Sequence, residues 1–338
     1  MNIRIAVRSH KGRGVHMTNQ KYDILCMGTA IVDCIIKGFR PEPISKTGFA
    51  ARSTSLAIGG ESVNQSIIAS RLGLRPALVS ALGTDAAGLF ARTCLEQEGI
   101  STELVVSHDG PTPVTVMFVD EAGNRKSITN RAHHYSFMPE QHLELLSSAR
   151  VLSLGSLFRA PFVEPEGLLA LLKHAKSLGM TVYADTKLPN GKVLSLADLA
   201  DALPYIDYIL PNEDEAAYYS AKEQPEDMAD VFLHHGIRHV IIKLGPKGCL
   251  YKSADQSFRL PACRVSAIDA TGAGDNFAAA FITAMLEGSD ELSALRFATA
   301  CAALSTTTVG ATAGVKDRES VERFLRAQEL TASNAPLF

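Results

Sequence analysis

The chain has 338 residues, of which 46% are hydrophobic, so it can bury a large core. Its formal net charge of −3 gives no electrostatic reason to expect nucleic acid or an anionic membrane surface as a partner. No stretch approaches the roughly 20 apolar residues that a membrane-spanning helix needs, so we expect a soluble protein with no membrane partner.

The six cysteines include no Cys-x-x-Cys pair, which suits neither a zinc site nor a redox motif. Reduced thiols and a cytoplasmic location are the expectation. Residues 1–21 contain several basic side chains and no acid, and we predict a disordered tail there, with a transit peptide as the alternative. Residues 329–338 are predicted to form a C-terminal tail.

From Tyr22 onward, short apolar runs alternate with segments of 3.6-residue periodicity. The predicted strands are 24–28, 77–80, 151–155, 181–185, 208–210 and 240–245. The predicted helices are 61–72, 86–98, 164–178, 226–235, 275–287 and 290–307. This alternation predicts a parallel sheet with helices on both faces, in which ligands bind beyond the carboxyl ends of the strands.

Two stretches, residues 34–58 and 111–130, interrupt the alternation. They contain Pro and Gly together with an alternating run at 114–119, a turn-like segment at 121–124 and a second short run at 125–128. We predict hairpin-like strands that form a small β-sheet lid over the site. Surface hairpins with no part in the site are the alternative.

A run of small residues precedes an acid where the helix 275–287 is predicted to begin: Gly272, Ala273, Gly274 and Asp275. Backbone N–H groups at such a helix start point at an anion, which the macrodipole also favours. Phosphoryl transfer needs this cradle beside a carboxylate, because the carboxylate takes the proton of the attacking hydroxyl while the N–H groups hold the charge of the transferred group. The alternative for Asp275 is a helix-capping acid.

Two further motifs accompany this run, Gly59-Gly60-x-x-x-Asn64 and Asn212-x-x-Glu215. The double glycine lets the backbone approach a ligand closely, and the second motif directly follows an apolar strand. In their order and spacing the three motifs resemble those of the ribokinase-like (PfkB-type) carbohydrate kinase family, over about residues 22–328. The resemblance implies a three-layer α/β/α fold with a mostly parallel central sheet and a small β-sheet lid, and an ATP-dependent kinase that phosphorylates a hydroxyl group.

The resemblance also implies roles for individual residues. Asp275 is expected to be the base, with an anion hole formed by Gly272, Ala273 and Gly274. The substrate-binding residues are expected to be Asp33, Gly59, Gly60, Asn64 and Arg131. Asp33 matches the family's acid at the end of the first strand, and such a carboxylate can accept hydrogen bonds from two vicinal hydroxyls. A turn-forming Asp that leaves a strand is the alternative.

The nucleotide-binding residues that the resemblance implies are Asn212, Lys187, Lys243, Gly245, Gly248 and Ala303. Asn212 and Glu215 would organise Mg²⁺ through water, and Mg²⁺ needs few protein ligands. Lys243 stands where many relatives carry Thr, and Lys187 has a surface lysine as its alternative. In relatives that a monovalent cation such as K⁺ activates, the ligands come from the positions of Asp269, Thr271 and Gly310, and this activation is left open here.

Two departures from ribokinases themselves make ribose an unexpected substrate. The segment 155–158 stands where ribokinases carry an acid after a strand, and residues 130–135 lack their small-residue run. Arg131 in the lid could bind a carboxylate or phosphate through its planar fork, with an exposed surface arginine as the alternative. We therefore expect a sugar or sugar acid, such as a hexose or a compound similar to 2-keto-3-deoxygluconate.

Two other functions were weighed. A nucleoside kinase of the same fold would bury a base against aromatic side chains, but the chain has no Trp and 7% aromatic residues. A non-catalytic sugar- or nucleotide-binding regulatory protein is disfavoured by the intact Asp275 and its cradle. A homodimer through the lid is expected, because the exposed edge of a small sheet needs protection.

Overall fold

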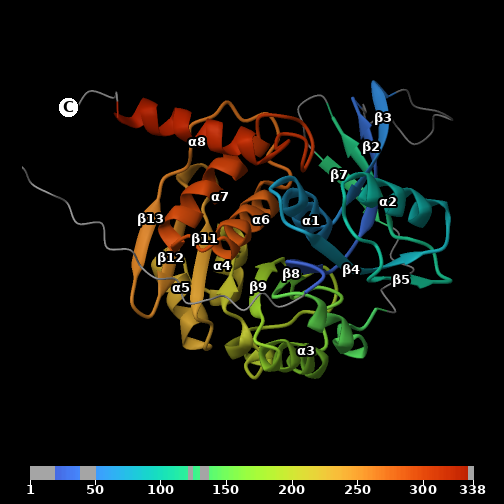
Figure 1. Cartoon of the computed structure of the whole chain (residues 1–338), viewed down its shortest axis with the longest axis horizontal. Coiled ribbons are helices and arrows are strands. Elements are labelled where there is room, and N and C mark those ends of the chain that lie inside the picture. The colour runs from blue at the N-terminus through green and yellow to red at the C-terminus, as the bar shows by residue number, and fades with distance from the viewer. Residues whose placement is uncertain (1–19, 39–50, 121–124, 130–136, 334–338) are drawn as a thin grey trace, which may run out of the picture.

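The computed structural model describes residues 20–38, 51–120, 125–129 and 137–333. Figure 1 shows a large α/β body with a small separate sheet at its upper right. Arg131, most of the predicted N-terminal tail and the end of the predicted C-terminal tail lie outside the described residues. Within the described residues, no helix has the length and apolar character to cross a membrane.

The main sheet has nine strands among the described residues, in the order β13-β12-β11-β10-β9-β8-β1-β4-β5. In this sheet, β11, β10, β9, β8, β1, β4 and β5 pair in parallel with their neighbours. The strands β12 and β13 add an antiparallel edge beside β11. Their bounds are β1 (Ile24–Met27), β4 (Pro76–Gly83), β5 (Val105–His108), β8 (Val151–Leu157), β9 (Thr181–Thr186), β10 (Tyr208–Ile209), β11 (His239–Lys243), β12 (Cys249–Ser253) and β13 (Ser257–Leu260).

Helices cover both faces of this sheet, with α1, α6, α7 and α8 on one face and α3, α4 and α5 on the other (Figure 1). Every residue of β4 and of β8 is buried, as expected for parallel strands between two helical layers. The helices are α1 (Glu61–Arg71), α2 (Ala86–Gln97), α3 (Pro165–Ser177), α4 (Glu213–Ser220), α5 (Pro225–His234), α6 (Ala273–Leu286), α7 (Glu291–Ser305) and α8 (Arg318–Ser333). Short 3-10 helices occupy Pro139–Gln141, Leu143–Ser148, Ala197–Leu199, Leu203–Tyr205 and Gly245–Lys247.

The small sheet has four strands in the order β3-β2-β6-β7, with bounds β2 (Ile31–Lys37), β3 (Ser53–Gly59), β6 (Val114–Val119) and β7 (Arg125–Thr129). We call it the lid sheet. Because neighbouring side chains on a strand point to opposite faces, its two faces differ. One face includes Asp33 and lines a cavity, whereas Val32 on the other face is buried in a cluster with α2.

The predicted fold class is confirmed, including the separate lid sheet, whose strands fall largely within the two stretches that interrupted the alternation. Two details differ from the sequence prediction. Asp33 does not end the first strand of the main sheet: the chain turns after β1, and Asp33 lies inside the lid strand β2. Helix α8 continues to Ser333, past the start of the segment 329–338 that was expected to be a tail. All six cysteines are unpaired.

Candidate active site

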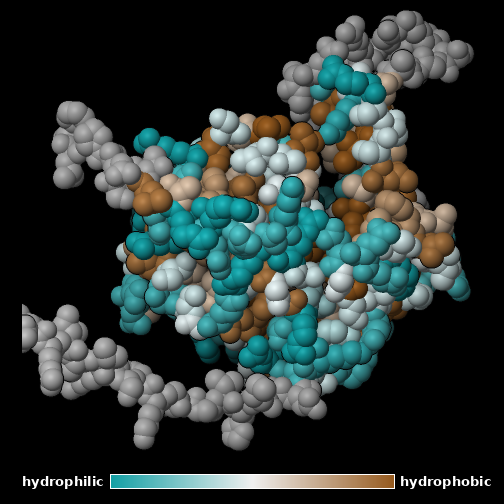
Figure 2. Space-filling model, turned by 45° about the horizontal axis from the view of Figure 1, so that its top comes forward, coloured by the Kyte–Doolittle hydropathy of each residue, from teal (hydrophilic) through white to brown (hydrophobic). Residues whose placement is uncertain are grey.

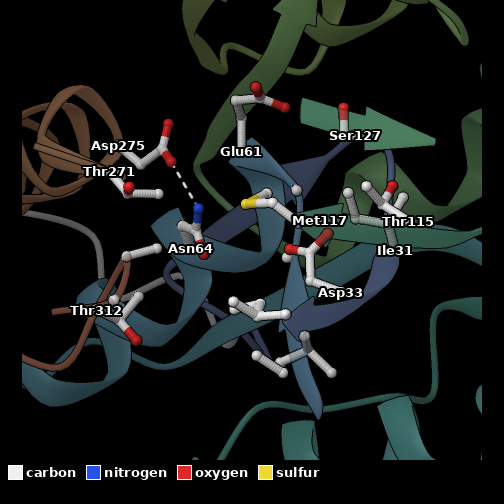
Figure 3. Close-up of a pocket in the computed structure, with 18 of the residues that line it drawn as sticks. Ile31, Asp33, Glu61, Asn64, Thr115, Met117, Ser127, Thr271, Asp275 and Thr312 are labelled. Carbon is white, nitrogen blue, oxygen red and sulfur yellow. Dashed lines mark hydrogen bonds between the residues drawn. The ribbon is translucent and has the colours of Figure 1, made fainter. Parts of the chain in front are cut away.

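A cavity of about 1090 Å³ lies between the lid sheet and the main body. Its walls come from the lid strands, the start of α1, the start of α6 and the segment before α8 (Figure 3). A cavity of this size is at the upper end of what small-molecule sites occupy. The predicted site residues that line it are Asp33, Gly59, Gly60, Asn64, Lys187, Asp269, Thr271, Gly272, Asp275 and Gly310.

Asp275 lies in the first turn of α6, and only 8% of its surface is exposed. The Asn64 side chain donates a hydrogen bond of 2.7 Å from Nδ2 to its Oδ2 atom (Figure 3). Burial, and then the negative charges of Glu61 and Asp185, raise the pKa of Asp275 to about 8. A carboxyl group with this pKa is ionised only in part near neutral pH, and its ionised form is a stronger base than an ordinary carboxylate.

The turn before α6 has the geometry of an anion cradle. Gly272 is the N-cap with φ of 72°, and a Cβ atom there would come within 2.5 Å of the Ala311 carbonyl oxygen, so only glycine fits. The Asn276 side chain donates from Nδ2 to the carbonyls of Gly272 and Ala311, each at 2.7 Å. The Ala273 N–H makes a long contact of 3.3 Å to the Ala270 carbonyl. Helix-start N–H groups held this way suit an anionic ligand.

Asp33 and Asn64 present unused acceptor oxygens. Within the described part of the chain, the buried Oδ1 atoms of Asp33 and Asn64 have no hydrogen-bond partner. A Cβ atom on Gly59 would lie 2.3 Å from Oδ2 of Asp33, so the glycine makes room for this carboxylate. Burial, and then the charge of Glu61, raise the pKa of Asp33 to about 6. Buried acceptors without partners are costly, which favours a hydroxyl-bearing ligand between them.

Glu61, which the sequence analysis did not single out, lies at the start of α1 and lines the cavity. Its Oε1 atom is 2.7 Å from Nζ of Lys187, and its Oε2 atom accepts a hydrogen bond of 2.6 Å from Oγ of Ser156. Burial alone would raise the pKa of Glu61, but Lys187 lowers it to about 2. The sequence feature that could have identified Glu61 is its place in the first helical turn, directly after the double glycine and one turn before Asn64.

Lys243, at the end of β11, lies behind the anion cradle rather than in the cavity wall. Its Nζ atom is 2.7 Å from Oδ1 of Asp185, and the two side chains are only 12% and 4% exposed. A Cβ atom on Gly274 would lie 3.1 Å from the same Nζ atom. The ammonium group therefore lies next to the residues that would hold a transferred phosphoryl group. Asp185 was not among the predicted site residues.

Comparison with known proteins identifies the family. The family model described as "pfkB family carbohydrate kinase" matches residues 21–318. The chain belongs to the pfkB family of carbohydrate kinases. A ribokinase from Haemophilus influenzae is 31% identical over 281 residues, covering 80% of this chain and 88% of the relative. A nucleoside kinase from Methanothermobacter thermautotrophicus is 30% identical over 311 residues, covering 89% and 95%.

Solved structures agree with this family and fold. The structure of Arabidopsis thaliana ribokinase complexed with ribose and ATP superposes with a TM-score of 0.78 at 26% identity, covering 90% of this chain and 99% of that one. The ribokinase from Thermotoga maritima gives a TM-score of 0.75 at 26% identity, covering 90% and 99%. The protein is therefore a sugar or nucleoside kinase of the pfkB family, with a hydroxyl group as acceptor.

The predicted magnesium motif of this kinase also caps a helix. Asn212 is the N-cap of α4, where its Oδ1 atom accepts from the Glu215 N–H at 2.8 Å and Oε2 of Glu215 accepts from the Asn212 N–H at 3.0 Å. Oγ1 of Thr186 donates to the same Oε2 atom at 2.8 Å. Burial raises the pKa of Glu215. Among the described residues, no group of three or more His, Cys, Asp or Glu could hold a metal ion.

The predicted monovalent-cation residues form one hydrogen-bonded unit. Oδ1 of Asp269 accepts from the N–H and the hydroxyl of Thr271, at 3.0 and 2.5 Å, and Oδ2 accepts from the Gly310 N–H at 3.0 Å. The carboxylate thus ties the segment before α6 to the loop after α7. Three of the predicted nucleotide-binding residues do not line the cavity: Gly245 and Gly248 in the turn after β11, and Ala303 on α7.

Proposed function

We propose that this kinase transfers the γ-phosphoryl group of ATP to a hydroxyl of a small sugar or sugar acid, with Asp275 as the base. The observation that carries the proposal is the buried Asp275 carboxylate, which lies between the anion cradle of α6 and the unused acceptor oxygens of Asp33 and Asn64. Such a carboxylate is in place to receive the proton of a hydroxyl that those oxygens orient.

In the proposed reaction, Asp33 and Asn64 accept hydrogen bonds from acceptor hydroxyls and turn one hydroxyl toward Asp275. Asp275 takes its proton, the hydroxyl oxygen forms a bond to the γ-phosphorus, and the bond between that phosphorus and the β,γ-bridging oxygen breaks, so that ADP leaves. The cradle N–H groups of Gly272, Ala273 and Gly274 stabilise the charge on the transferred group. Closure of the lid would exclude water and limit ATP hydrolysis.

The proposed cofactors are ATP and Mg²⁺. A putative ribokinase II from E. coli was solved in complex with ATP and Mg²⁺, at 24% identity to this chain. Mg²⁺, held through water by Asn212 and Glu215, would neutralise charge on the phosphates. Lys187 at the cavity wall and Lys243 behind the cradle would add fixed positive charge. The adenine side of the nucleotide would meet the turn with Gly245 and Gly248 and the α7 residue Ala303.

Activation by K⁺ is a separate proposal. The Asp269 carboxylate accepts bonds from Thr271 and Gly310, and carbonyl oxygens of the same two segments could complete an oxygen shell for the ion. A cation there would support the loop behind the anion cradle. Rates measured in K⁺ and in a bulky organic cation test this proposal, and equal rates would remove it.

The choice between a sugar and a nucleoside depends on the lid. The lid face of the cavity carries the apolar side chains Ile31, Ile35, Met117 and Val119 beside Asp33. An apolar wall of this kind could also cover a nucleobase, so a nucleoside kinase is the second candidate. The scarcity of aromatic residues still favours a sugar or sugar acid.

An ADP-release assay over a panel of hexoses, pentoses, sugar acids and nucleosides, with Asp275→Asn as the paired variant, tests the proposal. We expect the highest rate on a sugar or sugar acid and a loss of about 10²- to 10⁴-fold in kcat for Asp275→Asn, which is the usual contribution of a general base. Phosphorylation of nucleosides alone would select the second candidate. Equal rates for wild type and Asp275→Asn on the best acceptor would show that Asp275 is not the base.

We also propose a cytoplasmic homodimer that pairs through the lid. On the outer lid face, Leu56 and Ile128 are 57% and 68% exposed, and the strand register places them in one row with Cys34 and Val116. Figure 2 shows hydrophobic residues gathered at the upper right, where Figure 1 places the lid. An exposed apolar row on a small sheet favours burial against a second copy. Light scattering tests this state, and a monomer at micromolar concentration would contradict it.

A further inference from the structure

Ser156 lines the cavity, and its hydroxyl lies beside a buried carboxylate. The carboxylate comes from Glu61 at the start of α1, and the Ser156 hydroxyl donates to it at 2.6 Å. Ser156 lies near the end of β8, where the strand register is irregular, and its positive φ of 67° is a backbone conformation that non-glycine residues seldom adopt. Backbone strain of this kind is retained where the surrounding structure holds it.

Glu61 joins three elements that are distant in the sequence. Glu61 lies at the start of α1, Ser156 lies near the end of β8, and Lys187 directly follows β9. The Nζ atom of Lys187 is 2.7 Å from Oε1 of Glu61, and the Ser156 hydroxyl donates to Oε2. One turn further along α1, Asn64 donates a hydrogen bond to Asp275. The first turn of α1 therefore carries two groups that act on the base, Asn64 through a hydrogen bond and Glu61 through its charge.

The charged groups around Glu61 and Asp275 come from every neighbouring element. On Asp275, the charges of Glu61 and Asp185 raise the pKa, while Asn64 and Lys187 lower it. The charged side chains that face Glu61 itself are Lys187 after β9, Asp33 on β2 and Arg159 after β8.

We propose that Glu61 is a positioning residue for phosphoryl transfer, which holds the Lys187 ammonium and the Ser156 hydroxyl in place beside Asp275 at the acceptor end of the site. This inference rests on the proposed kinase reaction. In that reaction Lys187, which lines the same cavity as Asp275, supplies positive charge for the transferred phosphoryl group. Without a fixed partner a lysine side chain samples many rotamers, so Glu61 keeps its charge where the phosphoryl group arrives.

The variants Glu61→Gln and Glu61→Asp test this role on the best acceptor of the panel. Loss of the negative charge lowers the pKa of Asp275, so for Glu61→Gln the acid limb of the profile of kcat against pH should move down by about one pH unit. The plateau of kcat should also fall about tenfold to a hundredfold, because Lys187 loses its partner. Glu61→Asp keeps the charge and should restore the position of the limb and part of the plateau.

Glu226→Gln is the matched control, because the exposed Glu226 carboxylate pairs with Arg259 at 2.6 and 2.7 Å and lies outside the cavity wall. It should leave the pH profile and kcat unchanged. A Glu61→Gln enzyme with the wild-type limb position and plateau would overturn the proposal, and so would a lower plateau with an unmoved limb, which indicates a structural role only.

A second measurement separates this inference from the reaction itself. In protein labelled with ¹³C at the aspartate carboxyl carbons, the Asp275 signal, assigned by its loss in Asp275→Asn, reports the titration without any substrate. Its midpoint should fall by about one pH unit in Glu61→Gln. If wild type phosphorylates no acceptor while this midpoint still falls, the proposed function fails but the electrostatic coupling stands. An unmoved midpoint overturns the coupling.

Discussion

The two sides of Asp275 are built differently. On the acceptor side, which faces the lid, Asp33 and Asn64 carry buried oxygens that have no partner among the described residues. On the nucleotide side, behind the cradle, Lys243 is paired with Asp185 at 2.7 Å and Glu215 is bonded within the cap of α4.

The unpartnered oxygens on the acceptor side have hydrogen bonds left for a ligand. The paired side chains behind the cradle also stabilise the fold. An unpaired buried polar atom costs about 1–3 kcal/mol, so it is retained where a ligand satisfies it. A saturated buried pair can be kept for its structural role alone, although its charge still acts on a ligand nearby. We therefore expect substitutions on the acceptor side to change binding and those on the nucleotide side to change stability as well.

The largest effect on stability is expected for Lys243→Met. The variant removes the ammonium group and leaves Asp185 buried without its charge partner, which typically destabilises a protein by about 3–5 kcal/mol. The free energy of unfolding from urea titration measures this. The double variant Lys243→Met/Asp185→Asn should recover part of the loss, because no uncompensated charge remains.

Lys247→Met is the matched control for this prediction. Lys247 carries the same side chain in the next turn, but its partner is the partly exposed Glu213, with which it forms a surface pair at 2.9 Å. Surface pairs contribute about 0–1 kcal/mol. If Lys243→Met were as stable as the control, the Lys243–Asp185 pair would not stabilise the fold. The proposed difference between the two sides of Asp275 would then be wrong.

The sequence predicted the centre of this site better than its surroundings. Asp275 and its cradle could be predicted because they are contiguous and depend on local helix-start geometry. Glu61 could not, because its partner Lys187 lies far along the chain and meets it only through the order of β8 and β9 in the sheet. Asp185 was missed for the same reason, since its partner Lys243 lies at the end of another strand, β11.

The strand pattern of the main sheet was predictable because buried parallel strands form nearly continuous apolar runs. Asp33 was assigned to the end of the first such run, but the turn after β1 places it in the lid strand β2. Apolar residues resume at Ala30, two positions after Gly28, so the pattern alone did not separate β2 from β1. Helix α4 was not among the predicted helices, because it is short and its first turn is acidic.

Asp33→Asn tests the acceptor side. A carboxylate hydrogen bond contributes about 1.5–3 kcal/mol, so the KM for the acceptor should rise at least about tenfold while the KM for ATP stays unchanged. Because ionised Asp33 is buried without a partner for Oδ1, the variant should also be more stable than wild type at pH 7–8. An unchanged acceptor KM would show that Oδ1 of Asp33 does not bind the substrate.

The effect of Asp33 on stability should depend on pH in a way that follows from its pKa. The pKa of Asp33 is about 6 in the folded state, above the ordinary value of 3.8. The folded state therefore binds more protons between these values, and this group makes the free energy of unfolding decrease as pH rises through that window. The stability advantage of Asp33→Asn should appear as pH rises toward 6 and disappear below about 4. The acceptor kcat/KM of wild type, which the proposed base Asp275 already lowers below about pH 8, should fall more steeply as pH drops through about 6.

The smallest effect is expected for Asn212→Ala, which removes the side-chain cap of α4. Loss of an N-cap costs about 1 kcal/mol, so the midpoint of urea unfolding should fall modestly. Asn212→Ser separates the cap from the proposed part in organising Mg²⁺, because serine caps a helix about as well but lacks the amide. Wild-type stability with an increased requirement for Mg²⁺ in Asn212→Ser would assign the amide a role at the metal. Wild-type behaviour in both measurements would restrict Asn212 to the cap, and the nucleotide side would then be structural at this position.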